Sequence, residues 1–252
     1  MNYNQLTKED KEWLSRLEDL SELALTRKTP KFTKFCDERL LYIFNDYVKK
    51  QDFAPCMVWG GFPDADRGVI GFFPDFIEAD SSFFPLSLIK VSKASGCSHR
   101  DFLGSLLGLG IAREMIGDIL ISDSDAFIFI YDTVKDYVML SLTKVASKSV
   151  TVTEEENFSD LPQKKFEEIF GTVSSVRLDS VVSLFARTSR SDSQSLIGAE
   201  RVFVNHSVCT SASLRPKEGD IISVRGFGKM RISSIGSETK KGRIRITISK
   251  YV

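Results

Sequence analysis

Two arginines stand close together near residue 190, and their side chains could bind phosphate. Arg187 and Arg190 are separated only by Thr188 and Ser189. Arginine can donate paired hydrogen bonds to phosphate oxygens, and the N–H groups at a helix N-terminus also attract anions. The chemistry that this cluster indicates is noncovalent binding of an anion.

Two short helices would position this cluster. Apolar residues recur at i, i+3, i+4 and i+7 from Leu178 to Phe185, which predicts a first helix with one apolar face. Ser191 followed by Gln194 is a capping box and predicts the start of a second helix. Arg187 and Arg190 would then lie beside the N-terminus of the second helix, where the partial positive charge suits phosphate.

Hairpins are expected after the helices. Asn205-His206 predicts a tight turn because both residues tolerate the left-handed backbone region. Residues 217–220 predict a second turn. The last predicted hairpin pairs residues 230–235 with residues 243–249, and alternation along its second strand gives one apolar face and one basic face.

Charge is distributed unevenly along the chain. Residues 171–252 hold 14 Lys and Arg and 6 Asp and Glu, a net charge of +8, whereas residues 1–170 have a net charge of −8. A basic end on an acidic body indicates an anionic partner for that end. Charge alone leaves equally open a solvated charged surface with no partner.

Patterns of known catalytic sites do not occur in residues 1–170, where we find no GxGxxG, no GxxxxGK[ST], no HExxH and no GxSxG. Cys97 and His99 could support cysteine–histidine catalysis, but no third orienting group is evident. Acidic residues gather between Asp64 and Asp80, and turn chemistry explains them more simply. We therefore predict no catalytic residue, no metal and no organic cofactor.

The composition favours a protein of the cytoplasm. The four cysteines form no CxxC pair, so neither a zinc site nor a redox motif is predicted, and reduced thiols are expected. No apolar run approaches the roughly 20 residues that span a bilayer. The polar residues 1–10 lack the apolar stretch of a secretory signal.

The region before the basic end predicts an α+β protein of three domains. In an N-terminal α+β domain, residues 1–82, a helix capped by Thr7 is expected over 8–26, and Thr33 is expected to cap a second helix. The phenylalanines of residues 55–80 are expected to pack in a core, with a base-stacking platform as the alternative.

A middle domain is expected over residues 83–160. Its apolar segments and capping residues occur in the order β-α-β-β-α-β, which is the ferredoxin-like, RRM-like arrangement, with a helix opening at Ser98. The stacking aromatics of an RNP motif are not evident. A domain boundary with a short helix around residues 166–170 is expected before the C-terminal domain, residues 171–252.

The stretch from Arg177 to Arg225 resembles the S4-type RNA-binding domain. The similarity lies in Arg177-Leu178-Asp179, Ser189-Arg190-Ser191, Leu196-Ile197, Val202-x-Val204-Asn205 and Pro216-x-x-Gly219-Asp220-x-Ile222-x-Val224. His206 stands where the family usually has glycine, and we expect a local adjustment of the turn. The resemblance implies RNA-facing roles for Arg177, Arg187, Ser189, Arg190, Gln194, Asn205, Lys217 and Arg225. Charge alone adds Lys229 and Arg231.

An upstream segment, from Ser98-His99-Arg100-Asp101 to Arg113-Glu114-x-Ile116-Gly117-Asp118-Ile119, resembles the bacterial YlmH-like family. The resemblance implies a cytoplasmic factor that associates with the large ribosomal subunit in rescue or quality control of stalled translation, near peptidyl-tRNA. A link to cell division is also implied. His99, Arg100 and Arg113 are the middle-domain candidates for RNA contact, against helix capping and surface solvation as the alternative.

The sequence therefore predicts a non-catalytic RNA-binding protein, a monomer when free, whose partners are ribosomal RNA and tRNA rather than DNA or a membrane. Two alternatives stay open. One is an RNA-modifying enzyme of the pseudouridine synthase or methyltransferase type, and the other is a protein-interaction adaptor. The RNA interpretation requires that Arg187 and Arg190 lie together and are not bound to carboxylates of the same chain.

Overall fold

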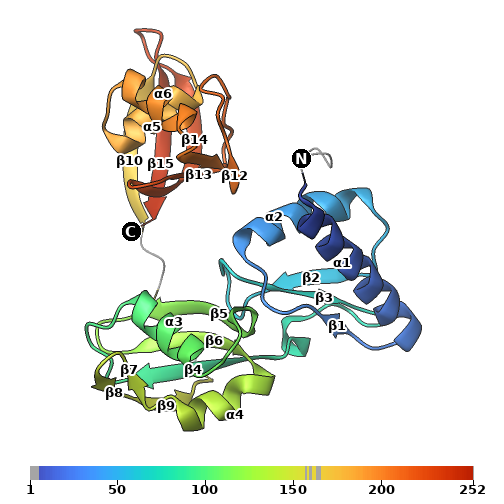
Figure 1. The fold of residues 1–252 in the computed structure, drawn as a ribbon. Helices are drawn as coiled ribbons and strands as arrows, with labels where there is room; N and C mark the ends of the chain where they lie inside the picture. The colour runs from blue at the N-terminus through green and yellow to red at the C-terminus, as the bar shows by residue number, and fades with distance from the viewer. Residues whose placement is uncertain (1–5, 157, 159–160, 163–165, 252) are drawn as a thin grey trace. The chain divides into compact units, whose positions relative to one another are not determined.

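The computed structural model describes residues 6–156, 158, 161–162 and 166–251, and the chain divides into two compact units, residues 1–162 and 163–252 (Figure 1). Both units combine helices with sheets, so the predicted α+β class is confirmed. The two domains expected over 1–82 and 83–160 lie within one compact unit. The expectation that residues 1–10 do not form a secretory signal concerns residues 1–5 in part, and these lie outside the described residues.

The first unit begins with α1 (Lys8–Arg27), which is capped by Thr7 in a capping box with Asp10, as predicted. The second helix, α2 (Glu38–Tyr47), is capped by Asp37, so the expected cap at Thr33 is wrong. Thr33 instead accepts a hydrogen bond from the backbone N–H of Ile70 and joins two strands.

A three-stranded antiparallel sheet accompanies these helices. Its order is β1-β3-β2, with β1 (Lys31–Phe32), β2 (Cys56–Trp59) and β3 (Val69–Phe72). A short 3-10 helix, η2 (Val48–Lys50), follows α2, and a second one, η3 (Ser81–Phe83), precedes the next sheet.

The second half of this unit has the predicted β-α-β-β-α-β order. Its elements are β4 (Leu86–Ser92), α3 (His99–Gly108), η4 (Arg113–Met115), β5 (Ile116–Ile121), β6 (Ala126–Tyr131), α4 (Asp132–Ser141) and β9 (Thr151–Glu154). The sheet order β5-β6-β4-β9, antiparallel throughout, is the ferredoxin-like arrangement. A small hairpin of β7 (Lys144–Val145) and β8 (Lys148–Ser149) is inserted before β9.

Both faces of this sheet are buried. One face packs on α3 and α4. The other presents Leu88, Phe127 and Phe129, which pack against Phe35 and Phe73 of the preceding residues. Phe127 and Phe129 are only 3% and 1% exposed. The phenylalanine cluster is therefore core, as expected, and it covers the sheet face that RNP-type domains use to stack bases.

The C-terminal unit is a six-stranded antiparallel sheet with two helices on one face (Figure 1). The sheet order is β10-β15-β14-β13-β11-β12. The elements are β10 (Phe166–Val173), α5 (Leu178–Ala186), α6 (Arg190–Gly198), β11 (Val202–Val204), β12 (Ser207–Val208), β13 (Ile221–Val224), β14 (Gly228–Glu238) and β15 (Ile244–Tyr251).

The helix expected over residues 166–170 is wrong, because these residues form the first half of β10. Every residue of β10, from Phe166 to Val173, pairs with a residue of β15. Ile169, Gly171 and Val173 face the helix side of the sheet, where Gly171 lies against Leu184, whereas Phe170 and Thr172 face the other side. The C-terminal unit therefore includes a strand that begins before residue 171.

Candidate nucleic-acid interface

The two predicted helices meet at a tight junction. Arg187 ends α5 in the left-handed conformation with φ of 52°, and Ser189 is the N-cap of α6. The predicted cap at Ser191 is wrong by two residues. Ser189 has the extended backbone of a cap and accepts from the N–H of Asp192 at 3.0 Å.

The N-terminus of α6 already carries a carboxylate. Asp192 accepts hydrogen bonds from the hydroxyls of Ser189 at 2.7 Å and Thr188 at 3.0 Å. These bonds hold the pKa of Asp192 below its usual value. The negative side chain competes with a phosphate for the same partial positive charge, so the cationic side chains, rather than the helix end, must attract RNA.

A buried carboxylate organises the cations around this junction. Asp179 has a side chain that is fully buried and accepts from three of the predicted RNA-binding residues. Arg177 donates to it at 3.2 Å, Arg190 at 3.0 Å and Gln194 at 2.9 Å. Burial by itself raises the pKa of Asp179, but the hydrogen bonds outweigh burial and hold the pKa well below its usual range.

The expectation that Arg187 and Arg190 form a pair without carboxylate partners is therefore wrong. Arg190 donates to Asp179 through both Nε and Nη2, because a buried carboxylate must be compensated by charged donors. Arg190 nevertheless remains 48% exposed. Arg187 is 80% exposed and lies 3.9 Å from Glu167, a long contact at the surface. The condition that the sequence set for the RNA interpretation is therefore not met by Arg190. The interpretation depends instead on the net positive charge that Arg177, Arg190 and Asp179 keep together and on the exposed parts of the two guanidinium groups.

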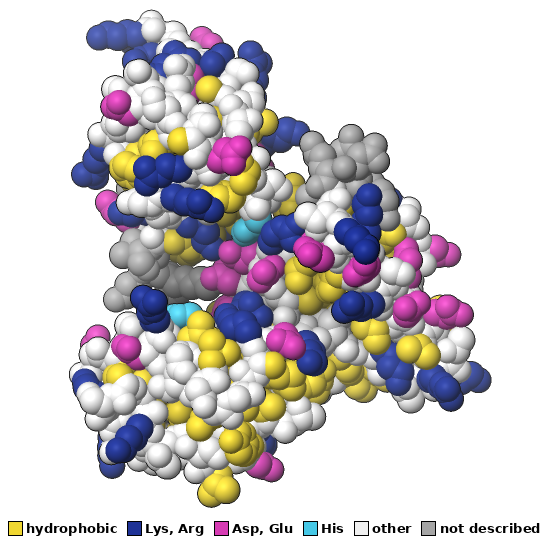
Figure 2. Space-filling view, in the orientation of Figure 1, with side chains coloured by type: hydrophobic (Ala, Val, Ile, Leu, Met, Phe, Trp, Pro, Cys, Tyr) yellow, Lys and Arg dark blue, Asp and Glu magenta, His cyan; other side chains and the backbone are white. Residues whose placement is uncertain are grey.

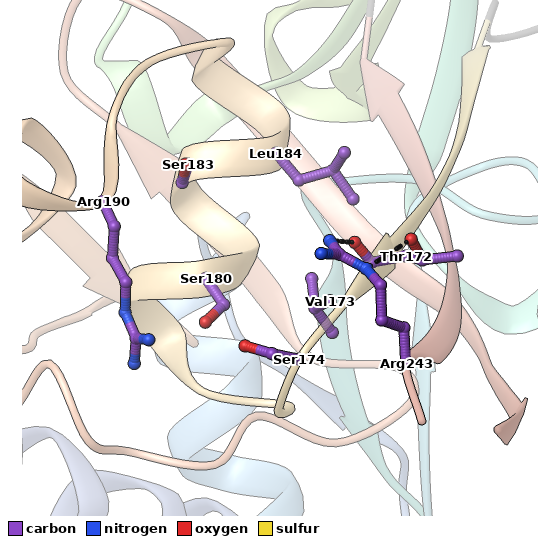
Figure 3. Close-up of a pocket in the computed structure, with 8 residues that line it drawn as sticks. All are labelled: Thr172, Val173, Ser174, Ser180, Ser183, Leu184, Arg190 and Arg243. Atoms are coloured by element: carbon purple, nitrogen blue, oxygen red, sulfur yellow. Dashed lines mark hydrogen bonds between the residues drawn. The ribbon is translucent and has the colours of Figure 1, made fainter. Parts of the chain in front are cut away.

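A pocket of about 260 Å³ adjoins this group. Figure 3 shows Arg190 and Arg243 on opposite sides of it, with the hydroxyls of Ser174 and Ser180 between them. Arg243 is anchored by donating to the carbonyl oxygen of Thr172 at 2.6 Å. Two guanidinium groups and two hydroxyls supply the donors that a phosphate group requires.

The loops at another edge of the sheet hold two further candidates. Asn205 and His206 both have positive φ, 46° and 66°, which confirms the predicted tight turn. The Asn205 amide donates to Asp220 at 2.9 Å and accepts from the N–H of Ile221, so its predicted RNA-facing side chain joins two loops. Lys217 is exposed in the second loop, where its backbone N–H donates to Asp220.

The remaining C-terminal candidates lie on the face of the sheet away from the helices. Arg225, Lys229 and Arg231 each lie over an aromatic ring at 4.3–5.6 Å. Figure 2 shows Lys and Arg side chains spread over the visible side of the C-terminal unit, with few acidic side chains among them. The basic character expected from the sequence is therefore a property of several surfaces.

The candidates of the first unit form a separate group. Ser98 and Asp101 form the predicted capping box of α3, and His99 and Arg100 are exposed on its first turn. Although part of the His99 side chain is exposed, desolvation of its imidazole and the neighbouring Arg113 lower the pKa of His99. Arg113 is half-buried and donates to the carbonyl oxygen of Ile116 at 2.7 Å, which indicates a structural role.

Catalytic chemistry gains no support from the cysteines. Cys97 is buried and donates to the carbonyl oxygen of Val145, whereas His99 is exposed. Burial raises the pKa of Cys36 to about 11, so this thiol is protonated. Within the described residues, no three His, Cys, Asp or Glu side chains gather as a metal site would require. No described helix is long and apolar enough to cross a bilayer.

Sequence reasoning missed two parts of this interface. Asp179 was visible only as part of a motif, although an acidic residue between basic ones in an apolar helix is a signal for a buried ion pair. Arg243 was placed on a basic strand face, but its position at the pocket depends on pairing with β10, over 70 residues away.

Comparison with known proteins agrees with the geometry. Residues 81–159 match the family model described as "Putative RNA-binding domain in YlmH", and residues 176–222 match the S4 domain. The C-terminal unit thus belongs to a class of RNA-binding domains. The chain is 31% identical over 253 residues to "Ribosome-associated protein quality control protein P2" of Bacillus subtilis (strain 168), covering 98% of each chain. It belongs to the YlmH-like family.

A solved structure gives the same result for the fold. "Cell division protein ylmH from Streptococcus pneumoniae" superposes with a TM-score of 0.53 at 21% identity, covering 64% of this chain and all of that one. This likeness concerns the fold alone.

Proposed function

We propose that the protein is a non-catalytic RNA-binding factor that binds ribosomal RNA of the large subunit in the rescue of stalled translation. The observation that carries the proposal is the cation cluster at the α5–α6 junction, fixed around Asp179. The name of the Bacillus subtilis relative, a ribosome-associated quality control protein, supports the ribosomal context. Peptidyl-tRNA as a second ligand, a cytoplasmic location, a monomeric free state and a link to cell division are finer parts of this proposal.

The proposed mechanism is neutralisation of phosphates by cations that are oriented in advance. Asp179 holds one side of the Arg177 and Arg190 guanidinium groups, so their exposed edges point to solvent in a fixed direction. A fixed cation loses little conformational entropy on binding. Arg187 and Lys217 add mobile charges that follow the RNA backbone, and the pocket between Arg190 and Arg243 accommodates one phosphate.

The test removes exposed cations without disturbing Asp179. In the Arg187→Ala/Lys217→Ala chain, we expect affinity for ribosomes to fall at least tenfold in cosedimentation at constant salt. The slope of log K against log salt should decrease by about two, one for each lost phosphate contact. Both residues are exposed, so the melting temperature should stay unchanged.

A matched control is the Lys8→Ala/Arg27→Ala chain, which removes two exposed cations of α1 in the other unit. Its ribosome affinity should match that of the unmodified chain. Equal cosedimentation of both double variants would contradict the proposal, because the exposed cations of the C-terminal unit would then contribute no more than any surface charge.

A further inference from the structure

The outer face of the C-terminal sheet, which faces away from α5 and α6, carries an unusual row of side chains. The register places Phe166 beside Tyr251, Lys229 beside Ser223 and Ser223 beside Phe203. Lys229 lies over the Tyr251 ring, which closes the row between β14 and β15. We call Phe166, Tyr251, Lys229, Ser223 and Phe203 the aromatic row.

The rings of this row are interleaved with cations. Arg225 lies 5.0 Å from the Phe203 ring centre, Lys229 lies 4.3 Å from that of Tyr251, and Arg231 lies 5.6 Å from that of Phe166. Phe166 and Tyr251 meet edge to face at 5.0 Å. Arg225 and Arg231 are themselves exposed, so their charges are available to a ligand on this face.

Sheet stability accounts for only part of this arrangement. Cross-strand aromatic pairs stabilise a sheet, and Phe166 with Tyr251 is such a pair. The open face of an antiparallel sheet is however usually polar, because its apolar residues turn to the core. Here the core face is complete without the row, being filled by Met230, Ile232 and Ile248 among others. The Phe166 ring, which is 39% exposed, and the partly exposed rings of Phe203 and Tyr251 can therefore contact a ligand.

Basic grooves with aromatic side chains are the usual construction of single-strand nucleic-acid sites, in which bases stack on rings and cations hold phosphates. The row crosses from β10 to β11, four strand spacings of about 4.8 Å or roughly 19 Å in all. This length accommodates several unpaired nucleotides. A duplex would shield its bases from the rings.

We propose that the aromatic row binds single-stranded RNA. Arg225, Lys229 and Arg231 lie over the rings in the free chain. On binding they turn to hold phosphates, and bases take their place against Phe166, Tyr251 and Phe203. This site is distinct from the α5–α6 junction, because the helices pack on the opposite face of the sheet. The proposal does not depend on ribosome binding through the junction.

The experiment measures binding of the full chain to a fluorescein-labelled oligouridylate of twelve nucleotides by fluorescence anisotropy. In the Phe166→Leu/Phe203→Leu chain, which keeps apolar bulk but removes two rings, we expect affinity to fall about 25-fold or more, fivefold or more for each lost stack. Phe170→Leu is the matched control, because Phe170 is 72% exposed on the same face of β10 but lies off the row. Its affinity should stay within twofold.

A second variant keeps the test decisive if the ring substitutions destabilise the sheet. Arg225→Gln/Arg231→Gln leaves the rings in place and should weaken oligouridylate binding while reducing its salt dependence. Unchanged affinity in both double variants would overturn the proposal and leave the row to a protein partner. The Lys8→Ala/Arg27→Ala chain, which changes neither proposed RNA site, should keep oligouridylate binding. Cosedimentation of the Phe166→Leu/Phe203→Leu chain with ribosomes tells failure of this proposal apart from failure of the ribosomal one.

Discussion

At the scale of single residues, the interface depends on a carboxylate that cannot itself touch RNA. Asp179 is buried and receives hydrogen bonds from Arg177, Arg190 and Gln194. The resemblance to the S4-type domain implied that these three residues face RNA, but it did not show that each of them binds a buried acid of the same chain. Which charged groups pair with one another depends on where they lie in the folded chain, and the sequence pattern carries no such information.

Replacing Asp179 by Asn should lower the unfolding free energy of the C-terminal unit by about 3 kcal/mol, because two guanidinium groups lose their buried partner. Urea unfolding at neutral pH measures the change. Glu200→Gln, at an exposed acid near the end of α6, is the control and should change stability by less than about 0.5 kcal/mol. Equal stability of all three chains would show that the cluster does not hold the fold together.

The same substitution gives a pH dependence with a definite sign. The pKa of Asp179 is lower in the folded chain than in the unfolded chain. Its stabilising contribution is complete above the unfolded pKa of about 3.9 and is lost as the pH falls through the folded pKa. The stability difference between the unmodified and Asp179→Asn chains should therefore be constant near neutral pH and shrink below about pH 4.

At the scale of elements, local sequence rules predicted that the helices exist more reliably than they predicted the residue at which each helix begins. Thr7 and Ser98 cap α1 and α3 as predicted, because each is followed at the third position by an acid that completes the box. Thr33 and Ser191 do not, because other capping residues lie within a few positions and tertiary contacts decide among them. The segment 166–170 forms a strand only by pairing with β15, which no local signal could reveal.

At Gly61 the backbone lies close to the ring of Phe129 in the ferredoxin-like sheet. Gly61 has φ of +101°, and a β-carbon there would lie 2.1 Å from an atom of the Phe129 ring. Gly61→Ala should therefore cost about 3 kcal/mol of unfolding free energy, through backbone strain and overpacking. Gly104→Ala is the control, because α3 leaves open space there and alanine should be neutral or stabilise by up to about 1 kcal/mol. Thermal unfolding of both variants separates these outcomes.

At the scale of the whole molecule, the order of strands and helices predicted the ferredoxin-like sheet, and the resemblance of residues 177–225 predicted the S4-type unit. The order could not show what covers the second face of the ferredoxin-like sheet, although alternation along β4 and β6 gives apolar residues on both faces. Nor could it place the cations of the C-terminal unit on two opposite faces of one sheet. These properties follow from how layers stack, and contacts across the chain determine them.

The residue at which a C-terminal fragment begins should change its stability and its association. A fragment of residues 163–252 should fold cooperatively and bind RNA with affinity that falls steeply with salt. A fragment of residues 171–252 lacks most of β10, so the backbone groups of β15 are left unpaired at a sheet edge. It should unfold at lower urea concentration and associate at high protein concentration. Equal behaviour in gel filtration and urea titration would mean that residues 166–170 contribute nothing to the unit.

The covered sheet face of the first unit affects how mutational scans should be interpreted. In an RNP-type domain, loss of RNA binding after replacing a ring on the central strands reports a lost stacking contact. Phe127 and Phe129 occupy comparable places here but are enclosed by other side chains. Loss of function at these positions will therefore report collapse of the interior, and residue roles cannot be transferred from RNA-reading relatives of this fold by alignment of strands alone.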